Sequence, residues 1–249
     1  MELSAFFREN PNIALAFSGG VDSAYLLYAA KQYGAKTTAY YVKTAFQPQF
    51  EYDDACRLAT ELEMPMKTIH LDVLSDCRVT ENPANRCYFC KHQIFTAILK
   101  EALADGYTVL MDGTNASDDM DDRPGMKALH ELSVRSPLRE CGLTKPMIRE
   151  LSKEAGLFTW DKPAYACLAT RIPMDTPITR ELLSRTETAE NALRELGFTD
   201  FRIRLMGDMA KLQLRESQFE RLLSLRETVY HILRQYYSAV LLDLEVRDE

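Results

Sequence analysis

The 249-residue sequence predicts an α/β fold in which helices sandwich a parallel sheet, followed by a smaller C-terminal α+β unit. Two observations predict it. In the first part of the chain, short strand-like segments alternate with segments whose apolar residues recur at helical spacing. In the last part, the order changes to a helix, two strands, a helix and a final strand. We place the boundary at residue 165, so the predicted domains are 1–165 and 166–249.

Each element follows from its local residues. The first strand, at 13–17, is a short apolar run, and the second, at 37–42, is rich in β-forming residues. Thr144 is expected to cap the last helix of the first domain, and Gly156 to end it. The remaining predicted strands are 66–71, 107–111, 201–205, 209–214 and 239–246. The predicted helices are 23–33, 52–62, 87–104, 144–156, 178–196 and 217–236.

The composition limits the class of function. Lys and Arg number 30 against 37 Asp and Glu, and this net charge of −7 argues against nucleic acid as the substrate. We expect no membrane span, because the apolar stretches are too short, and no signal peptide at the N-terminus. We therefore expect a cytoplasmic protein. Its six cysteines are then thiols, metal ligands or catalytic groups rather than disulfides.

A glycine-rich segment, Ser-Gly-Gly-Val-Asp-Ser at 18–23, connects the first strand to the first helix. Consecutive backbone amides at a helix start bind oxyanions, and two hydroxyls add further donors. Phosphate loops commonly end in Lys followed by Ser or Thr, whereas this segment contains the acidic Asp22. A carboxylate beside phosphates is favourable when magnesium bridges the two. Taken alone, the segment is also compatible with an ordinary Gly-Gly turn.

The segment 18–23 after an apolar strand resembles the pyrophosphate-binding loop of the PP-loop ATP pyrophosphatases, which have the adenine nucleotide alpha hydrolase-like fold. Those enzymes split ATP between the α and β phosphates, so the resemblance implies ATP and Mg²⁺. It also explains the missing lysine, since pyrophosphate is the leaving group. The segment 112–118 is similar to their second nucleotide-side motif. The nucleotide-binding residues thus implied are Ser18, Gly19, Gly20, Asp22, Ser23, Asp112, Thr114 and Asn115, with Asp22 also a catalytic residue and Mg²⁺ ligand.

One branch of that superfamily matches more of the chain. The segments 85–91, 136–138, 162–173 and 201–205 resemble the LarE-type sulfur transferases, and the resemblance covers essentially the whole sequence. Those enzymes convert carboxylates of a pyridinium biscarboxylic acid mononucleotide to thiocarboxylates during assembly of the nickel-pincer cofactor. The resemblance implies an ATP-dependent sulfurtransferase that adenylates a carboxylate of this small-molecule substrate. It also implies a homo-oligomer.

Three cysteines are the candidates for sulfur chemistry. Cys167 lies in a segment that matches the family, and in one variant of the family this cysteine gives up its own sulfur. Arg171 and Lys162 are cations that would favour its thiolate. Cys87 and Cys90 form a Cys-x-x-Cys pair at a helix start; zinc sites use four ligands, whereas three cysteines suit a [4Fe–4S] cluster with one open iron. The predicted sulfur source is therefore either a cluster-bound sulfide or Cys167 itself. Buried structural cysteines are the simpler alternative.

The C-terminal domain is expected to bind the substrate. Arg202 and Arg204 alternate on one predicted strand and so project from one face, where two guanidinium groups would bind a phosphate. Glu190 corresponds to a family acid near the substrate or a metal, and Arg171 completes the predicted substrate-binding set. Residues 206–208 stand where family members often have a histidine, so the sequence departs from the pattern for a metal there.

Two other functions remain open from sequence. Some PP-loop proteins thiolate tRNA, which predicts a basic groove or an added RNA-binding module. A nucleotide-binding or iron–sulfur regulatory protein without catalysis is the other. The partner that we predict is a small mononucleotide, with no nucleic acid and no membrane.

Overall fold

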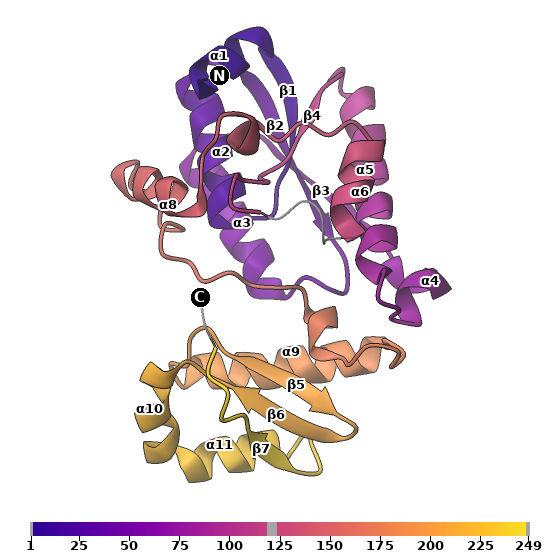
Figure 1. The fold of residues 1–249 in the computed structure, drawn as a ribbon, viewed down its shortest axis with the longest axis vertical. Helices are drawn as coiled ribbons and strands as arrows, with labels where there is room; N and C mark the ends of the chain where they lie inside the picture. Colours follow the sequence, from indigo (N-terminus) through magenta and orange to yellow (C-terminus); the bar gives the residue numbers. More distant parts are fainter. Residues whose placement is uncertain (1, 119–123, 248–249) are drawn as a thin grey trace. The chain divides into compact units, whose positions relative to one another are not determined.

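The computed structural model describes residues 2–118 and 124–247. The chain forms two compact units (Figure 1). The first unit comprises Met1–Val73 and Asn85–Lys162, and the second comprises Leu74–Ala84 and Pro163–Glu249. Each unit has its own sheet and its own buried residues, and each is described separately below.

The first unit contains a four-stranded parallel sheet with the strand order β3-β2-β1-β4. Its strands are β1 (Asn12–Ala16), β2 (Lys36–Lys43), β3 (Met66–His70) and β4 (Leu110–Met111). β1 lies at the centre and pairs in parallel with both β2 and β4. The predicted α/β class, with a parallel sheet between helices, is confirmed.

Helices cover both faces of this sheet because its strands are apolar on both sides. Ile13 and Leu15 of β1 pack into one core, whereas Ala14 between them packs into a second core on the opposite face. The first face is covered by α1 (Leu3–Glu9), α2 (Val21–Gln32), α3 (Gln49–Glu61), α7 (Pro137–Glu140) and α8 (Lys145–Glu154). The second face is covered by α5 (Arg86–Ala104) and α6 (Pro124–Glu131).

The strand order determines where the site forms. β1 and β4 are neighbours, so the loop that follows β1 and the turn that follows β4 leave the sheet at the same edge. Ligands of open parallel sheets bind at the carboxyl ends of the strands. The two sequence motifs at 18–23 and 112–118 begin at these two strand ends.

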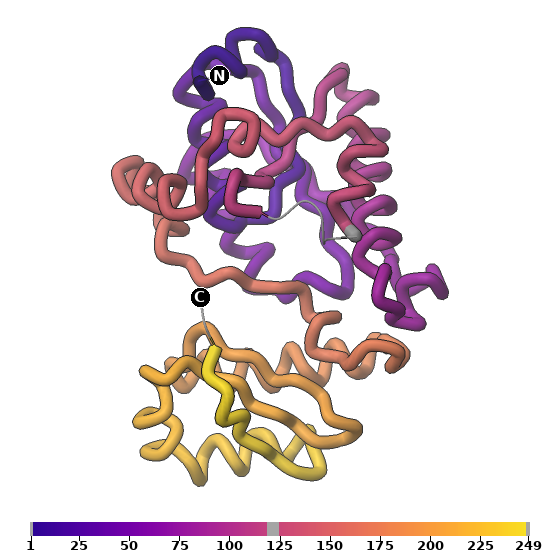
Figure 2. Tube along the Cα trace, in the orientation of Figure 1, coloured from indigo at the N-terminus to yellow at the C-terminus, as the bar shows by residue number. Residues whose placement is uncertain are grey.

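The second unit contains a three-stranded sheet with the order β5-β6-β7. Figure 2 follows β5 (Arg202–Met206) through a tight turn into the antiparallel β6 (Met209–Gln213), and shows the parallel β7 (Val240–Leu242) beside β6. α9 (Arg180–Glu195) packs against β5, and α11 (Arg226–Leu233) packs against α9. A short 3₁₀ helix, Leu168–Arg171, also contacts both α9 and β5.

Several elements differ from the sequence-based expectation. The predicted helix at 217–236 consists of a 3₁₀ turn at Glu216–Gln218, α10 (Phe219–Ser224) and α11, because the backbone leaves the helical region at Leu225 (φ −108°, ψ 15°). Residues 74–84, with η1 (Val73–Ser75) and α4 (Cys77–Thr80), pack with the C-terminal residues. There, Asn82 donates to the carbonyl of Pro173 at 2.7 Å.

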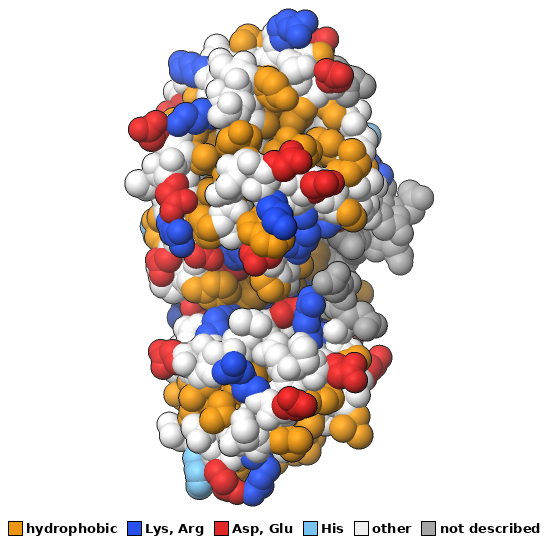
Figure 3. Space-filling view, turned by 90° about the vertical axis from the view of Figure 1, so that its left-hand side faces the viewer, with side chains coloured by type: hydrophobic (Ala, Val, Ile, Leu, Met, Phe, Trp, Pro, Cys, Tyr) orange, Lys and Arg blue, Asp and Glu red, His pale blue; other side chains and the backbone are white. Residues whose placement is uncertain are grey.

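The surface carries both signs of charge. On the face shown in Figure 3, Lys and Arg side chains are interspersed with Asp and Glu side chains and with apolar groups. Among the helices of the described residues, none is long and apolar enough to cross a membrane.

Gly19 provides a test of how tightly the loop packs. It has φ +73°, and a Cβ on it would lie 3.0 Å from the Cβ of Ala55 on α3. Gly19→Ala is expected to lower the free energy of unfolding by about 1–3 kcal/mol, from left-handed strain and from the close contact. Urea titration followed by circular dichroism measures it. Gly20→Ala is the matched control, because Gly20 has φ −79° and its Cβ would meet only Ser18 Oγ, at 3.5 Å. Equal losses in the two variants would contradict the prediction.

Candidate active site

The loop 18–23 is organised by two serine hydroxyls. Ser18 Oγ and Ser23 Oγ lie 3.0 Å apart. The Ser23 hydroxyl also donates to the Gly20 carbonyl at 3.2 Å and accepts from the Ser18 amide at 3.3 Å. α2 begins within this segment, at Val21, and among the described residues no side chain caps its first turn. Helix-start amides that lack a side-chain cap can bind an oxyanion.

The cation that the loop lacks in sequence comes from α8. Lys145, the first residue of that helix, places its Nζ 2.6 Å from Oδ2 of Asp22. The other oxygen of Asp22, Oδ1, is buried and has no hydrogen-bond partner in the described part of the chain. Burial raises the pKa of Asp22, although the charge and hydrogen bond of Lys145 offset part of the rise. A buried carboxylate oxygen without a partner fits the expected Mg²⁺, which takes carboxylate and phosphate oxygens as ligands.

The turn after β4 lies against this loop. A Cβ on Gly113 would come within 2.9 Å of the Ser23 amide nitrogen, so glycine permits this close approach. Asp112 fixes the turn, because it accepts from the Thr114 hydroxyl at 2.5 Å and from the Thr114 amide at 3.2 Å. It also accepts from the Ser136 hydroxyl at 2.7 Å. The structure thus brings the two predicted nucleotide motifs together at one edge of the sheet.

The rest of the turn connects the loop to α8. The side-chain oxygen of buried Asn115 accepts from the Ser117 backbone amide at 2.8 Å, and the backbone amide of Asn115 donates to the Asp118 carboxylate at 3.0 Å. The Ser117 hydroxyl in turn accepts from the backbone amide of Lys145 at 3.0 Å. The charge of Asp118 also contributes to the raised pKa of Asp22. Through Ser117, Asn115 therefore helps to position Lys145, the first residue of α8.

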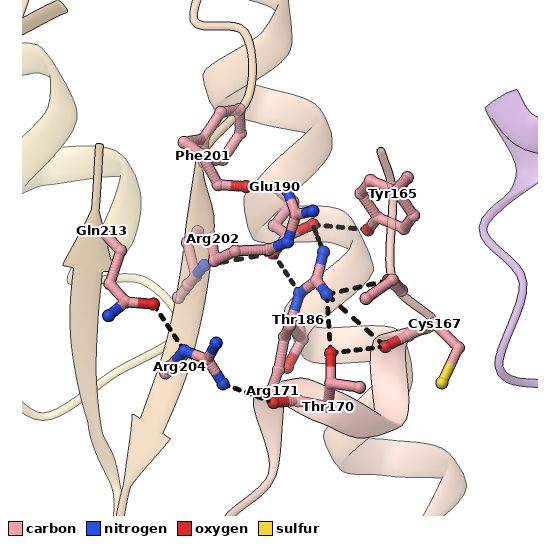
Figure 4. Close-up of polar contacts among 12 residues, drawn as sticks. Tyr165, Cys167, Thr170, Arg171, Thr186, Glu190, Phe201, Arg202, Arg204 and Gln213 are labelled. Carbon is pink, nitrogen blue, oxygen red and sulfur yellow. Dashed lines mark hydrogen bonds and ion pairs between the residues drawn. The ribbon is translucent and has the colours of Figure 1, made fainter. Parts of the chain in front are cut away.

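Cys167 lies in the second unit and directly precedes the 3₁₀ helix Leu168–Arg171. Its carbonyl accepts from the Thr170 amide at 3.0 Å and from the Thr170 hydroxyl at 2.9 Å. The residue is half-buried, and Figure 4 shows its sulfur pointing away from the surrounding arginine side chains. A thiol that is held on an ordered turn can act as a nucleophile.

Glu190 and Arg171 form an ion pair with no solvent exposure of either side chain. Arg171 donates from Nε to Oε1 at 2.8 Å and from Nη2 to Oε2 at 3.2 Å. The Tyr165 hydroxyl donates to Oε2 at 2.6 Å, and the Ile203 amide donates to Oε1 at 3.1 Å. Burial raises the pKa of Glu190, but the bonds and charge of Arg171 outweigh it, so the net pKa is lowered. Glu190 is therefore an ionised acid whose two oxygens both accept hydrogen bonds within the unit.

Arg202 is nearly buried at the start of β5. It donates to the carbonyl of Phe201 at 2.8 Å and to that of Ala164 at 2.6 Å. Burial lowers its pKa to about 10, and the positive charges of Arg171 and Arg247 contribute. Glu190 and Asp200 act in the opposite direction, and Asp200 lies 3.7 Å from Nη1 of Arg202.

Arg204, two residues along the same strand, is half-buried. It donates from Nε to Gln213 at 2.5 Å and from Nη1 to the Thr170 carbonyl at 2.9 Å. Gln213 is itself oriented by Asp243, to which it donates at 2.6 Å. Figure 4 shows Arg202 and Arg204 on the same side of β5. Burial, and then the charge of Arg171, lowers the pKa of Arg204 as well.

The other predicted sulfur ligands lie in the first unit. Cys87 and Cys90 are in the first turns of α5; Cys87 is exposed and Cys90 is buried. Arg86 places Nη2 3.8 Å from the Cys87 sulfur. Within the described residues, no group of three or more His, Cys, Asp or Glu side chains is arranged to hold a metal ion. The thiols of Cys87 and Cys90 have the right chemistry for a cluster, but the proposed third thiol belongs to the second unit.

Lys162 does not have the surroundings that the sequence suggested. Its Nζ lies 2.7 Å from Asp54 and 3.2 Å from Glu51, both on α3. Two carboxylates of the first unit thus balance the charge that was expected to favour the Cys167 thiolate.

Some residues of the site are not among those predicted from sequence. A loop containing an acid where a cation is usual could have prompted a search for a distant lysine, and Lys145 at a helix start was such a residue. The hydrogen-bond partners of the predicted residues in the second unit could not be found in this way. Tyr165, Thr170 and Gln213 are polar residues with no distinctive sequence pattern, and only the fold brings them to Glu190, Arg171 and Arg204.

Comparisons with known proteins found two relatives that match nearly the whole chain and one that matches part of it. No family model matches the chain. An uncharacterized protein of Synechocystis is 36% identical over 98% of this chain and 92% of its own length. The pyridinium-3,5-bisthiocarboxylic acid mononucleotide synthase of Lactiplantibacillus plantarum is 31% identical over 97% of this chain and 89% of its own length. A tRNA-specific 2-thiouridylase of Fervidobacterium nodosum is 30% identical over 41% of this chain and 36% of its own length.

The raised pKa of Asp22 predicts how stability depends on pH. A carboxyl group whose pKa is higher in the folded protein stabilises the fold below its unfolded pKa, and this contribution is lost as the pH rises through its folded pKa. Asp22→Asn, which cannot ionise, is therefore expected to be more stable than the wild type at pH 7. The difference should vanish near about pH 3, where Asp22 is protonated in both states. Urea midpoints measured across this range test it.

Asp105→Asn is the matched control, for which we expect the opposite change in stability at pH 7. Hydrogen bonds from Lys67 and Tyr40 lower the pKa of Asp105, so its ionised form stabilises the fold above the unfolded pKa. This variant is expected to be less stable than the wild type at pH 7. A destabilised Asp22→Asn variant at pH 7 would contradict the prediction.

Proposed function

The chain belongs to the LarE family, that of the pyridinium-3,5-bisthiocarboxylic acid mononucleotide synthases, and on this premise we propose that it is an ATP-dependent sulfurtransferase. Its proposed substrate is pyridinium-3,5-biscarboxylic acid mononucleotide, of which it converts a carboxylate to a thiocarboxylate. The observation that supports this most directly is the loop 18–23, where Asp22 lies in the first turn of α2. One of its oxygens contacts Lys145, and the other has no hydrogen-bond partner among the described residues.

We propose that the first unit performs the activation step. A carboxylate oxygen of the substrate attacks the α-phosphorus of ATP, the bond between the α and β phosphates breaks, and pyrophosphate leaves. The amides of the loop and the ammonium group of Lys145 stabilise the charge that develops on the leaving group. Asp22 would hold Mg²⁺, which supplies further neutralisation of phosphate charge. The product is an acyl adenylate.

The second step exchanges the activated oxygen for sulfur. A sulfur nucleophile attacks the acyl carbon, the bond from that carbon to the AMP oxygen breaks, and AMP leaves. We propose that Cys167 is at the centre of this step and that Arg202 and Arg204 attract the phosphate of the mononucleotide. Burial is the main cause of their lowered pKa values and the charge of Arg171 adds to it, and a phosphate bound nearby would offset both effects.

Two sulfur sources remain in the proposal. A [4Fe–4S] cluster held by Cys87, Cys90 and Cys167 would supply a transferable sulfide at an open iron. Alternatively, Cys167 gives its own sulfur: Sγ bonds to the acyl carbon, the Cα proton is removed, and the Cβ–Sγ bond breaks to leave dehydroalanine. We favour the cluster because Cys87 and Cys90 are spaced for shared ligation at a helix start.

The activation step is tested by pyrophosphate release. With ATP, Mg²⁺ and the mononucleotide, the wild type is expected to release pyrophosphate and form AMP. Lys145→Met should lower kcat by about 100-fold, because a preorganised cation at the leaving group is lost. Lys153→Met is the matched control on the same helix, since Lys153 lies over the ring of Trp160 instead. Equal activity in both lysine variants would remove Lys145 from the mechanism.

The sulfur source is tested by anaerobic purification followed by iron and sulfide analysis and intact mass. We expect about four irons per chain, lost in Cys87→Ala together with multiple turnover. Absence of iron, with a mass loss of one H₂S per turnover, would instead assign the sulfur to Cys167. If neither bound iron nor this mass loss is observed, both proposed sulfur sources are contradicted.

Thiolation of tRNA is the second candidate, and the similarity to a tRNA-specific 2-thiouridylase over 41% of this chain supports it. The net charge of −7 weighs against it. Firm, salt-sensitive binding of total tRNA in an electrophoretic shift would favour this candidate. No pyrophosphate release with either substrate would leave a non-catalytic regulatory protein.

A further inference from the structure

The residues 164–170, here called the Cys167 segment, are held by arginine side chains through their backbone carbonyls. Arg202 donates to the Ala164 carbonyl at 2.6 Å. Arg171 donates from Nη1 to the Ala166 carbonyl at 2.9 Å, with a longer contact of 3.5 Å to that of Cys167. Arg204 donates to the Thr170 carbonyl at 2.9 Å. All three of the arginines predicted to bind substrate therefore use hydrogen bonds on the segment that contains Cys167. Figure 4 shows those of Arg171 and Arg204.

This arrangement gives an irregular segment the partners that a strand or helix would otherwise provide. Its regular structure is limited to the single 3₁₀ turn Leu168–Arg171. A backbone carbonyl that leaves water needs a donor, and a guanidinium group offers several in a rigid plane. Fixing these carbonyls fixes the φ and ψ angles on either side of Cys167. The direction of its Cα–Cβ bond, and hence the region that Sγ can reach, follows from them.

Arg171 is itself held in place by Glu190. The carboxylate accepts from Nε and Nη2, at 2.8 and 3.2 Å, which leaves Nη1 to reach the Ala166 carbonyl and the Thr170 hydroxyl, both at 2.9 Å. The Tyr165 hydroxyl donates to the same carboxylate, and its ring lies 4.6 Å from the Arg171 guanidinium carbon. Arg171 and Glu190 have no solvent exposure, so neither side chain presents a surface to a ligand in this conformation.

We propose that Glu190, Arg171 and Tyr165 are positioning residues that orient Cys167, rather than residues that contact the substrate. Glu190 orients Arg171, and Arg171 fixes the backbone on which the thiol is mounted. This inference rests on the proposed function for its catalytic consequence, but its structural part concerns the thiol alone and can be measured without substrate.

Arg171→Lys is the most direct variant. Lysine keeps the positive charge beside Glu190, but its single ammonium group cannot hold the carboxylate and the Ala166 carbonyl with the geometry of a planar guanidinium. The segment loosens, and the half-buried Cys167 becomes more accessible. Peptide-resolved alkylation of Cys167 by iodoacetamide is expected to become at least about fivefold faster at saturating pH, with the midpoint of its pH profile unchanged because the charge is retained. Cys77, an exposed cysteine of the same unit, is the internal reference.

The kinetic signature separates positioning from contact. With ATP and the mononucleotide, Arg171→Lys is expected to lower kcat by at least about tenfold, with the KM values for both substrates unchanged. Arg204→Ala is expected to raise the KM for the mononucleotide. Tyr165→Phe, which removes a single hydrogen bond to Glu190, should shift alkylation and kcat in the same directions by a smaller factor. Tyr165→Phe also keeps the inference testable if Arg171→Lys fails to fold.

Arg185→Lys is the matched control, because Arg185 pairs with Asp208 in the same unit and makes no described bond to the Cys167 segment. It should leave the alkylation rate and kcat at wild-type values. Unchanged alkylation of Cys167 in Arg171→Lys and Tyr165→Phe would overturn the inference, as would a rise in KM with kcat unchanged. If the wild type itself releases no pyrophosphate, the proposed function fails, whereas the alkylation rates still decide whether Arg171 orients the thiol.

Discussion

The buried charge of Glu190 is the constraint on which the second unit depends. An ionised carboxylate without solvent exposure is tolerated only when donors and an opposite charge surround it. Arg171 supplies the charge, and removing one partner of such a pair typically costs about 3–5 kcal/mol. Because two nitrogens of Arg171 are used on Glu190, the third is directed at the Ala166 carbonyl. Neutralising one buried acid therefore also fixes the backbone beside Cys167.

Asp22 in the first unit shows the opposite arrangement. It is partly buried, but within the described residues only one of its oxygens has a hydrogen-bond partner, Lys145, and its pKa is raised rather than lowered. Glu190 receives donors on both oxygens and has a lowered pKa. A carboxylate with complete partners stabilises structure, whereas one with an unfilled oxygen is available to a ligand. The same residue class thus has two roles, and the number of donors around each acid distinguishes them.

Sequence was sufficient for the features that depend on local pattern. The apolar strands, the loop 18–23 and the turn at 112–118 are contiguous, and adjacent parallel strands place both motifs at one edge. The partner of Asp22 was not predicted, because Lys145 is separated from it by 123 residues and only the packing of α8 unites them. The break at Leu225 was missed because the helical apolar pattern continues through it.

Arg171, Glu190, Arg202 and Arg204 were predicted as substrate ligands from their residue type and family position. What sequence could not provide was how each guanidinium is already used, since its acceptors are backbone carbonyls, which every residue has. A carbonyl at Ala164 or Thr170 carries no compositional signal, and it becomes specific only when the chain places it opposite an arginine. Residue type therefore predicted where the positive charges would lie, whereas the fold determines which acceptors each guanidinium group bonds.

Both proposed sulfur sources need the hydrogen bonds of Arg171, Arg202 and Arg204 to hold Cys167 in a fixed position. If a cluster supplies the sulfide, Cys167 would be one of the residues that hold it and would need a fixed position. If Cys167 is the donor, its Sγ would need to approach the acyl carbon along a defined line. In both cases misplacement of one atom by about 1 Å can lower the rate by a hundredfold. Apart from the single 3₁₀ turn at Leu168–Arg171, the Cys167 segment lacks the regular backbone hydrogen bonds of a helix or strand that would otherwise prevent such movement. Arginine-to-carbonyl hydrogen bonds, anchored by the charge of Glu190, provide that rigidity, so the network is required whichever atom finally supplies the sulfur.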